Sequence, residues 1–324
     1  MALAMSQVRT ARLGGKRLMV LLAILGGTVL LALLSAPTWA PRFGFALPLR
    51  PAGMRVRLAS GHQINVFDEG SGTPVVLVHG LPGSAHDWRP LPERLIGAGF
   101  RVIRYDRIGY GHSSRRVAGE SHSIGANASD LLQLLSALRL SRPIVVGWSY
   151  GGAVAQYAAI QRPSDIGGLL LVGTDGPGNL PSRTFARLFA WTLPLRVWGI
   201  RAGFPARLGV RRMARQAFQG DAPPWWPERA LAVLSPEGVA RTWTEEVAGF
   251  DPTGIDAARI SVPVTLVHGT EDTFVSPAVS TSLHREIAAS VLVTIKGGGH
   301  MLPITHTDVV VEELARLASR EHAP

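Results

Sequence analysis

A serine, an aspartate and a histidine follow one another along the chain in settings that could support nucleophilic chemistry. Ser149 lies in Gly147-Trp-Ser-Tyr-Gly151, directly after the apolar run 143–146 and before a helix-like stretch, 153–160. A serine hydroxyl is a weak nucleophile, so it needs a base beside it and a turn sharp enough to expose its oxygen. Glycines at 147 and 151 permit such a turn, because a Cβ at either position would crowd the backbone. Strand, tight turn and helix in this order predict a nucleophile, whereas an incidental serine in a glycine-rich turn is the alternative.

The acid and the base are expected later in the chain. Asp272 follows the apolar run 263–268, and His300 stands in a glycine-rich loop after another run, 291–295. Asp175 also follows a strand-like run and is an alternative acid. Asp272 is preferred because it directly precedes the strand that leads to His300. Each residue would lie at the carboxyl end of a strand, where open α/β sheets bind their ligands.

From about Met54 to its end, the chain resembles the α/β-hydrolase family. The segments that carry the resemblance are 147–152, 269–272 and 299–300. The resemblance implies that Ser149 is the nucleophile and that His300 takes its proton. It also implies that Asp272 holds the imidazole in the correct tautomer and stabilises its charged form.

The same resemblance indicates which groups would stabilise a tetrahedral oxyanion. Such an oxyanion needs donors that are fixed before the reaction. The backbone N–H of Tyr150, directly after the nucleophile, is one expected donor, and the N–H of Leu81 in His79-Gly-Leu-Pro-Gly83 is the other. Gly80 and Trp148 are expected at the pocket, although Trp148 could equally be plain core.

Apolar runs that alternate with helical patterns predict the α/β fold class. Two runs, 74–80 and 166–172, are typical of strands buried on both faces. Further strands are expected over 101–106, 144–146, 262–268 and 291–295. Helices are expected over 124–140, around 278–289 and over about 307–319. We therefore expect the α/β-hydrolase fold, a mostly parallel doubly wound sheet, with an antiparallel hairpin over 54–67 at its start.

The rhythm of strands and helices breaks after Asp175 and resumes near Ile260. Nine prolines fall in this stretch, several of them where proline suits the first turn of a helix. The pattern predicts an inserted cap of four or five short helices. The expected division is an anchor or signal segment (1–40), a linker (41–53), an α/β-hydrolase core (54–175 and 261–324) and a helical cap (176–260).

The N-terminal segment is apolar and uncharged from Leu18 to Ala40, with Arg and Lys before it. As a helix it would extend for roughly 34 Å, which is long enough to cross a bilayer. We therefore expect an uncleaved transmembrane helix that anchors the catalytic body to the membrane outside the cytoplasm. Cleavage of a signal peptide after Ala40, giving a secreted or periplasmic protein, is the alternative.

Composition narrows the class of function. The absence of cysteine excludes disulfides, thiolate metal sites and a cysteine nucleophile. The ten histidines show no metal-ligand spacing, and triad chemistry needs no cofactor, so neither a metal nor a cofactor is expected. The net charge of +10 is concentrated before residue 68 and between 176 and 220. No nucleic-acid reader motif accompanies it, so no nucleic-acid partner is expected.

The sequence therefore predicts a serine hydrolase that cleaves a carboxylic ester, lipid-like or with a small apolar acyl group. Carbon–carbon bond hydrolysis, peracid formation of the haloperoxidase type and acyl transfer remain alternatives on the same fold. A ligand-binding protein without catalysis is the alternative from a different class, because fold does not dictate function. The cap interleaves aromatic residues with arginines, which fits either a lid on anionic lipid or a solvated surface, and the solvated surface is preferred.

Overall fold

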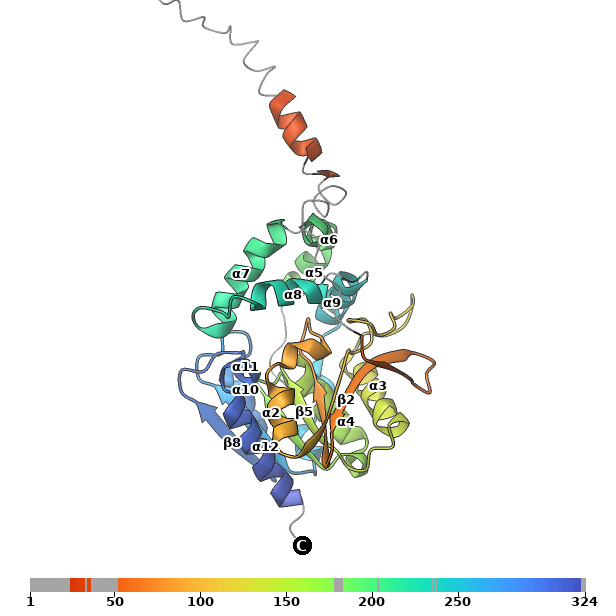
Figure 1. Cartoon of the computed structure of the whole chain (residues 1–324), viewed down its shortest axis with the longest axis vertical. Helices are drawn as coiled ribbons and strands as arrows, with labels where there is room; N and C mark the ends of the chain where they lie inside the picture. Colours follow the sequence, from red (N-terminus) through yellow and green to blue (C-terminus); the bar gives the residue numbers. More distant parts are fainter. Residues whose placement is uncertain are drawn as a thin grey trace, which may run out of the picture.

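The structure of the chain is a computed structural model. It describes residues 24–32, 34–35, 52–177, 183–202, 204–234, 236 and 238–321. From residue 52 on, the described chain has two parts, a sheet covered by helices and a group of helices above one end of that sheet (Figure 1).

Eight strands of the described chain form one sheet, in the order β1-β2-β4-β3-β5-β6-β7-β8. They are β1 (Met54–Arg57), β2 (Gln63–Gly70), β3 (Thr73–Val78), β4 (Phe100–Tyr105), β5 (Ile144–Trp148), β6 (Gly168–Val172), β7 (Val264–Gly269) and β8 (Ser290–Ile295). The pairs β1–β2 and β2–β4 are antiparallel, and all the other pairs are parallel. The predicted fold class, a mostly parallel sheet that starts with an antiparallel hairpin, is confirmed.

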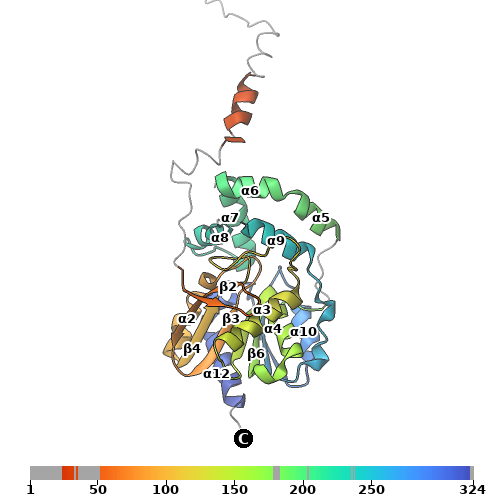
Figure 2. The same cartoon turned by 90° about the vertical axis from the view of Figure 1, so that its right-hand side faces the viewer.

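The central strands are buried on both faces, which explains their continuous apolar sequences. Along β3, Val75 and Leu77 pack into one core, while Val76 and Val78 pack into the other. Helices α2 (Leu91–Gly97) and α12 (Thr307–Glu321) cover the first face, and α3 (Ile124–Ala137), α4 (Tyr150–Gln161) and α10 (Pro277–Glu286) cover the second (Figure 2). Helix α3 ends three residues before the predicted Leu140, because Arg139 has a positive φ of 52°.

The predicted helical insertion lies between β6 and β7. Five helices of the described chain form it, and they gather above one end of the sheet (Figures 1 and 2). They are α5 (Arg183–Trp191), α6 (Leu193–Ala202), α7 (Phe204–Phe218), α8 (Trp226–Leu234) and α9 (Val239–Ala248). We call these five helices the cap. The predicted boundaries between anchor, linker, core and cap remain a prediction.

The predicted membrane-anchored localisation is wrong. Among the residues that the structure describes, no helix is both long and apolar enough to cross a bilayer. The remainder of the predicted span, the linker and the alternative cleavage position after Ala40 lie mostly outside the described residues.

Candidate active site

Ser149 occupies the sharp turn between β5 and α4. It is the residue that precedes α4, and its backbone has φ 55° and ψ −126°, a conformation that L-residues rarely adopt. The flanking glycines are required by close contacts. A Cβ on Gly147 would lie 2.5 Å from the Cα of Gly152, and one on Gly151 would lie 2.0 Å from the carbonyl oxygen of Val78. The glycine pattern therefore lets the helix begin directly against the strand, with Ser149 at the junction.

His300 and Asp272 form a direct pair. The Nδ1–H of His300 donates to Oδ2 of Asp272 at 2.7 Å. Asp272 follows β7, and His300 follows β8, as the sequence predicted. The aromatic ring of Phe274 stacks on the imidazole with the ring centres 5.4 Å apart. Because Nδ1 is engaged by the carboxylate, the other ring nitrogen of His300 is the one left to accept a proton.

The surroundings of Asp272 keep it ionised. Its Oδ1 accepts the backbone N–H groups of Phe274 and Val275 at 2.9 and 3.0 Å. Nε2 of His268, a residue of β7, lies 3.3 Å from Oδ2. Burial alone would raise the pKa of Asp272, but hydrogen bonds from His268 and His300 outweigh it and hold the pKa well below its ordinary value.

The predicted oxyanion residues lie on both sides of Ser149. A Cβ on Gly80 would lie 3.2 Å from the Cβ of Ser149, so the backbone turn after β3 packs directly against the serine. Leu81 follows in that turn, and Tyr150 follows Ser149 in α4. The structure thus brings the two predicted backbone donors to one place, while their role in binding an oxyanion remains a prediction.

Trp148 contacts the histidine loop and also lines the cavity. Its indole Nε1–H donates to the backbone carbonyl oxygen of His300 at 3.1 Å, which ties the histidine loop to the end of β5. Its side chain also lines the cavity described below. The contact supports the predicted place of Trp148 at the pocket.

Asp175, the alternative acid, also lies beside the serine. Its backbone N–H donates to the carbonyl oxygen of Ser149 at 3.1 Å, and its own carbonyl oxygen accepts from Gln156. These contacts stabilise the turn through the backbone. The carboxylate that bonds to His300 belongs to Asp272.

A cavity of about 720 Å³ opens between the core loops and the cap. Ser149, His300, Leu81 and Tyr150 all line it from the core side. The cap side is largely apolar and comes from several helices. It includes Val210, Met213, Val233, Leu234, Trp243 and Val247. A cavity of this size and character is typical of a small-molecule site.

Sequence reasoning missed three residues around this site. His268 supports Asp272, and a buried ion pair joins Arg107 to Glu246 of α9. His268 stands four residues before Asp272, and this spacing at the end of a strand was a usable signal. Arg107 and Glu246 are 139 residues apart, and a glutamate in a cap helix carries no local sign of burial. Among the described residues, no group of three or more His, Asp or Glu side chains could hold a metal ion.

The chain matches known proteins over most of its length. The family model for the alpha/beta hydrolase fold matches residues 73–307. A non-heme chloroperoxidase from Streptomyces lividans is 31% identical over 261 residues, which cover 75% of this chain and 90% of that protein. A 2-hydroxy-6-oxo-2,4-heptadienoate hydrolase from Pseudomonas putida is 30% identical over 267 residues, covering 77% and 90%. The structure of an esterase from Exiguobacterium antarcticum shares the fold with a TM-score of 0.71 at 20% identity, covering 82% of this chain and 99% of that one.

Proposed function

Because the chain belongs to the α/β-hydrolase family, we propose that it is a serine hydrolase that cleaves carboxylic esters with an apolar acyl group. The observation that supports the proposal most is the cavity of about 720 Å³ that Ser149 and His300 both line. The bond from His300 to Asp272 adds support, because it leaves the imidazole oriented to act as a base.

The proposed reaction proceeds through an acyl-serine. Nε2 of His300 takes the hydroxyl proton of Ser149 while the Oγ of Ser149 attacks the ester carbonyl carbon. The negative charge that develops on the carbonyl oxygen is stabilised by the backbone N–H groups of Leu81 and Tyr150. His300 then protonates the leaving alcohol. Water, deprotonated by the same histidine, then attacks the acyl-serine. The acid is released and the histidine returns the proton to the Ser149 Oγ, while Asp272 stabilises the imidazolium at each step.

The walls of the cavity support an apolar substrate. The cap contributes aliphatic and aromatic side chains opposite Ser149, among them Met213 and Trp243. Burial of apolar surface gives about 25 cal/mol per Å², so each methylene of an acyl chain that enters this space adds to binding. A carboxylic ester with an apolar acyl group, either small or lipid-like, is therefore the expected substrate class.

Labelling with a fluorophosphonate probe tests the proposal. The wild-type chain should form a covalent adduct at Ser149, and the Ser149→Ala variant should not. A panel of p-nitrophenyl esters from acetate to dodecanoate then defines the acyl preference by kcat/KM. An unlabelled wild-type chain without esterase activity would instead support a ligand-binding protein.

Peracid formation is a second candidate, and the identity of 31% to a non-heme chloroperoxidase favours it. In this reaction hydrogen peroxide replaces water and attacks the acyl-serine, which releases a peracid and regenerates the serine. The peracid then oxidises a halide in solution. Bromination of monochlorodimedone in acetate, peroxide and bromide should depend on Ser149, and bromination that survives Ser149→Ala would exclude this route.

A further inference from the structure

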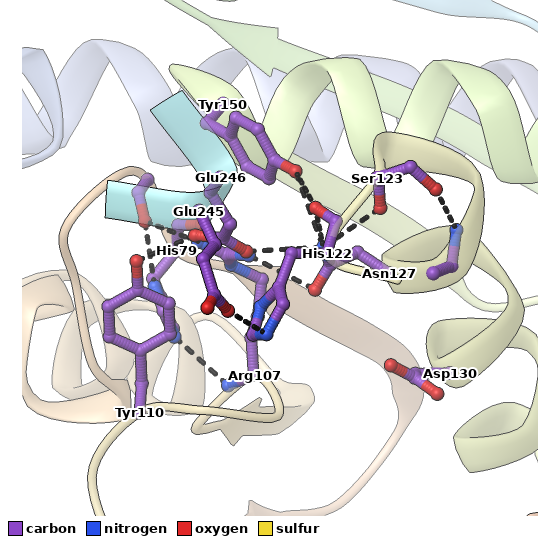
Figure 3. A network of polar contacts seen from close by, with 12 residues as sticks. His79, Arg107, Tyr110, His122, Ser123, Asn127, Asp130, Tyr150, Glu245 and Glu246 are labelled. Carbon is purple, nitrogen blue, oxygen red and sulfur yellow. Dashed lines mark hydrogen bonds and ion pairs between the residues drawn. The ribbon is translucent and has the colours of Figure 1, made fainter. Parts of the chain in front are cut away.

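A buried polar cluster joins the cap to the loops beneath it (Figure 3). At its centre, Arg107 of the loop after β4 forms an ion pair with Glu246 of α9. The Arg107 residue is 2% exposed, and Glu246 is fully buried. Burial alone would lower the pKa of Arg107, but the adjacent Glu246 raises it above its ordinary value, so the guanidinium stays charged.

The carboxylate of Glu246 accepts hydrogen bonds from several side chains of the cluster. Tyr110 Oη donates to Glu246 Oε2 at 2.6 Å, and Asn127 Nδ2 donates to Oε1 at 3.1 Å. Arg107 Nη2 donates to Oε2 at 3.2 Å. Removing one partner of a buried ion pair is far more damaging than removing both, because the remaining charge is left uncompensated. Glu246 is therefore what allows a charged arginine to be buried here.

Arg107 in turn holds the turn that carries Leu81. Its Nε donates to the backbone carbonyl oxygen of His79 at 3.2 Å, and its Nη2 donates to that of Gly80 at 3.1 Å. The Gly80 oxygen also accepts from His79 Nδ1–H at 2.9 Å, so Arg107 supplies the charged one of its two donors. The carbonyl of Gly80 and the N–H of Leu81 belong to the same peptide group, which is trans. In a planar trans peptide the C=O and N–H point to opposite sides. A fixed Gly80 oxygen therefore fixes the direction of the Leu81 N–H.

Tyr150, whose backbone N–H is the other predicted donor, contacts Arg107 through its side chain. The guanidinium carbon of Arg107 lies 4.6 Å from the centre of the Tyr150 ring, and Asn127 Nδ2 donates to the Tyr150 hydroxyl at 3.3 Å. The positive charge of the Arg107 guanidinium beside the Gly80 carbonyl oxygen also polarises this peptide group, which strengthens the Leu81 N–H as a donor. Arg107 thus holds the peptide group of the Leu81 donor directly and packs against the side chain of Tyr150, the other donor residue.

We propose that Glu246 is a positioning residue, which acts through Arg107 to aim and polarise the Gly80–Leu81 peptide at the oxyanion. The inference rests on the proposed serine hydrolase function. The Leu81 N–H is then aimed at the oxyanion only when α9, which carries Glu246, is docked on the core. The cap would then contribute to the rate of the chemical step as well as to substrate binding.

Glu246→Gln tests the inference, with Asp130→Asn as the matched control. Asp130 forms a buried ion pair with Arg116, in which the Asp130 side chain is 8% exposed and the Arg116 side chain is 6% exposed. Asp130 takes no part in the contacts described above for the oxyanion turn. Removing one donor from an oxyanion site costs about 100- to 1,000-fold in kcat, so a misaimed donor should cost about 10- to 100-fold. Glu246→Gln should lower kcat by this factor with KM within about threefold. Asp130→Asn should lower the Tm and leave kcat within about twofold.

A double variant separates positioning from stability. Arg107→Met/Glu246→Leu removes both charges, so its Tm should recover relative to Glu246→Gln. Its kcat should stay low, because methionine supplies neither the second hydrogen bond nor the positive charge at the Gly80 carbonyl, which keeps only the neutral donor of His79. A kcat that recovers with the Tm, or a kcat that Glu246→Gln leaves unchanged, would overturn the inference.

Hydrogen–deuterium exchange provides a readout that does not need activity. Exchange in the segment 76–84 should increase in Glu246→Gln and not in Asp130→Asn. Failure of wild-type labelling by the fluorophosphonate would refute the proposed function. Unchanged exchange and kcat in an active Glu246→Gln enzyme would refute the inference alone.

Discussion

Ser149 keeps a backbone conformation that costs about 1–3 kcal/mol for a residue with a side chain. Three backbone hydrogen bonds offset this cost. Its N–H donates to Val172 at the end of β6, and its carbonyl oxygen accepts from Gly152 and Asp175. The turn is therefore held by the neighbouring strand and its loop as well as by its own helix. A conformation kept at this cost points to a use for the Ser149 hydroxyl at the cavity, which is the role proposed for it.

Asp272→Asn should reduce kcat by about 1,000- to 10,000-fold, because an amide in this position stabilises neither the correct tautomer of His300 nor its charged form. The equivalent change at Asp175 should alter kcat by less than about tenfold, since the Asp175 contacts to Ser149 run through its backbone. Steady-state hydrolysis of p-nitrophenyl butyrate measures both variants. The opposite ranking would assign the acid to Asp175.

At the scale of elements, the junction of β5 and α4 requires glycine for steric reasons. Gly147→Ala would bring a Cβ to 2.5 Å from the Cα of Gly152, a backbone contact that side-chain rotation cannot relieve. We expect a loss of at least about 2 kcal/mol in the free energy of unfolding, together with loss of activity.

Gly97→Ala is the control for that change. Gly97 is the last residue of α2, and a Cβ there would meet nothing within 4 Å. Its effect on the free energy of unfolding should stay within about 1 kcal/mol, in the stabilising direction that alanine gives in a helix. Urea denaturation of both variants provides the comparison. Equal midpoints for the two would contradict the steric argument.

At the scale of the whole molecule, patterns that are local in sequence were predictable, and contacts between distant segments were not. The strands and the positions of Ser149, Asp272 and His300 follow from apolar runs and from the residues at their ends. The pairing of Arg107 with Glu246 depends on how the cap docks, and no periodicity encodes that. The predicted anchor rested on the length of an uncharged apolar run alone, and no helix among the described residues is long and apolar enough to cross a bilayer.

The stability of the whole fold should fall as the pH drops below about 6.5, and His79 beneath the oxyanion turn is one cause. His79 is fully buried. Its Nε2 accepts the backbone N–H of Arg107 at 3.0 Å, and its Nδ1–H donates to the carbonyl oxygen of Gly80 at 2.9 Å. Burial, and then the charge of Arg107, hold the pKa of His79 well below its ordinary value. Protonation is therefore easier in the unfolded chain, so stability is complete above about pH 6.5 and declines below it.

The loss of stability at low pH can be assigned to individual histidines by urea denaturation, which measures the free energy of unfolding of each variant between pH 8 and pH 5. One group of this kind removes at most about 1.4 kcal/mol per pH unit. The lowered pKa of His122 acts in the same direction, whereas the contribution of Asp272 is lost only below about pH 4. His79→Gln should therefore lessen the slope without abolishing it, and His284→Gln, at an exposed position on α10, should match the wild type. A wild-type slope in His79→Gln would mean that the buried imidazole does not cause the acid sensitivity.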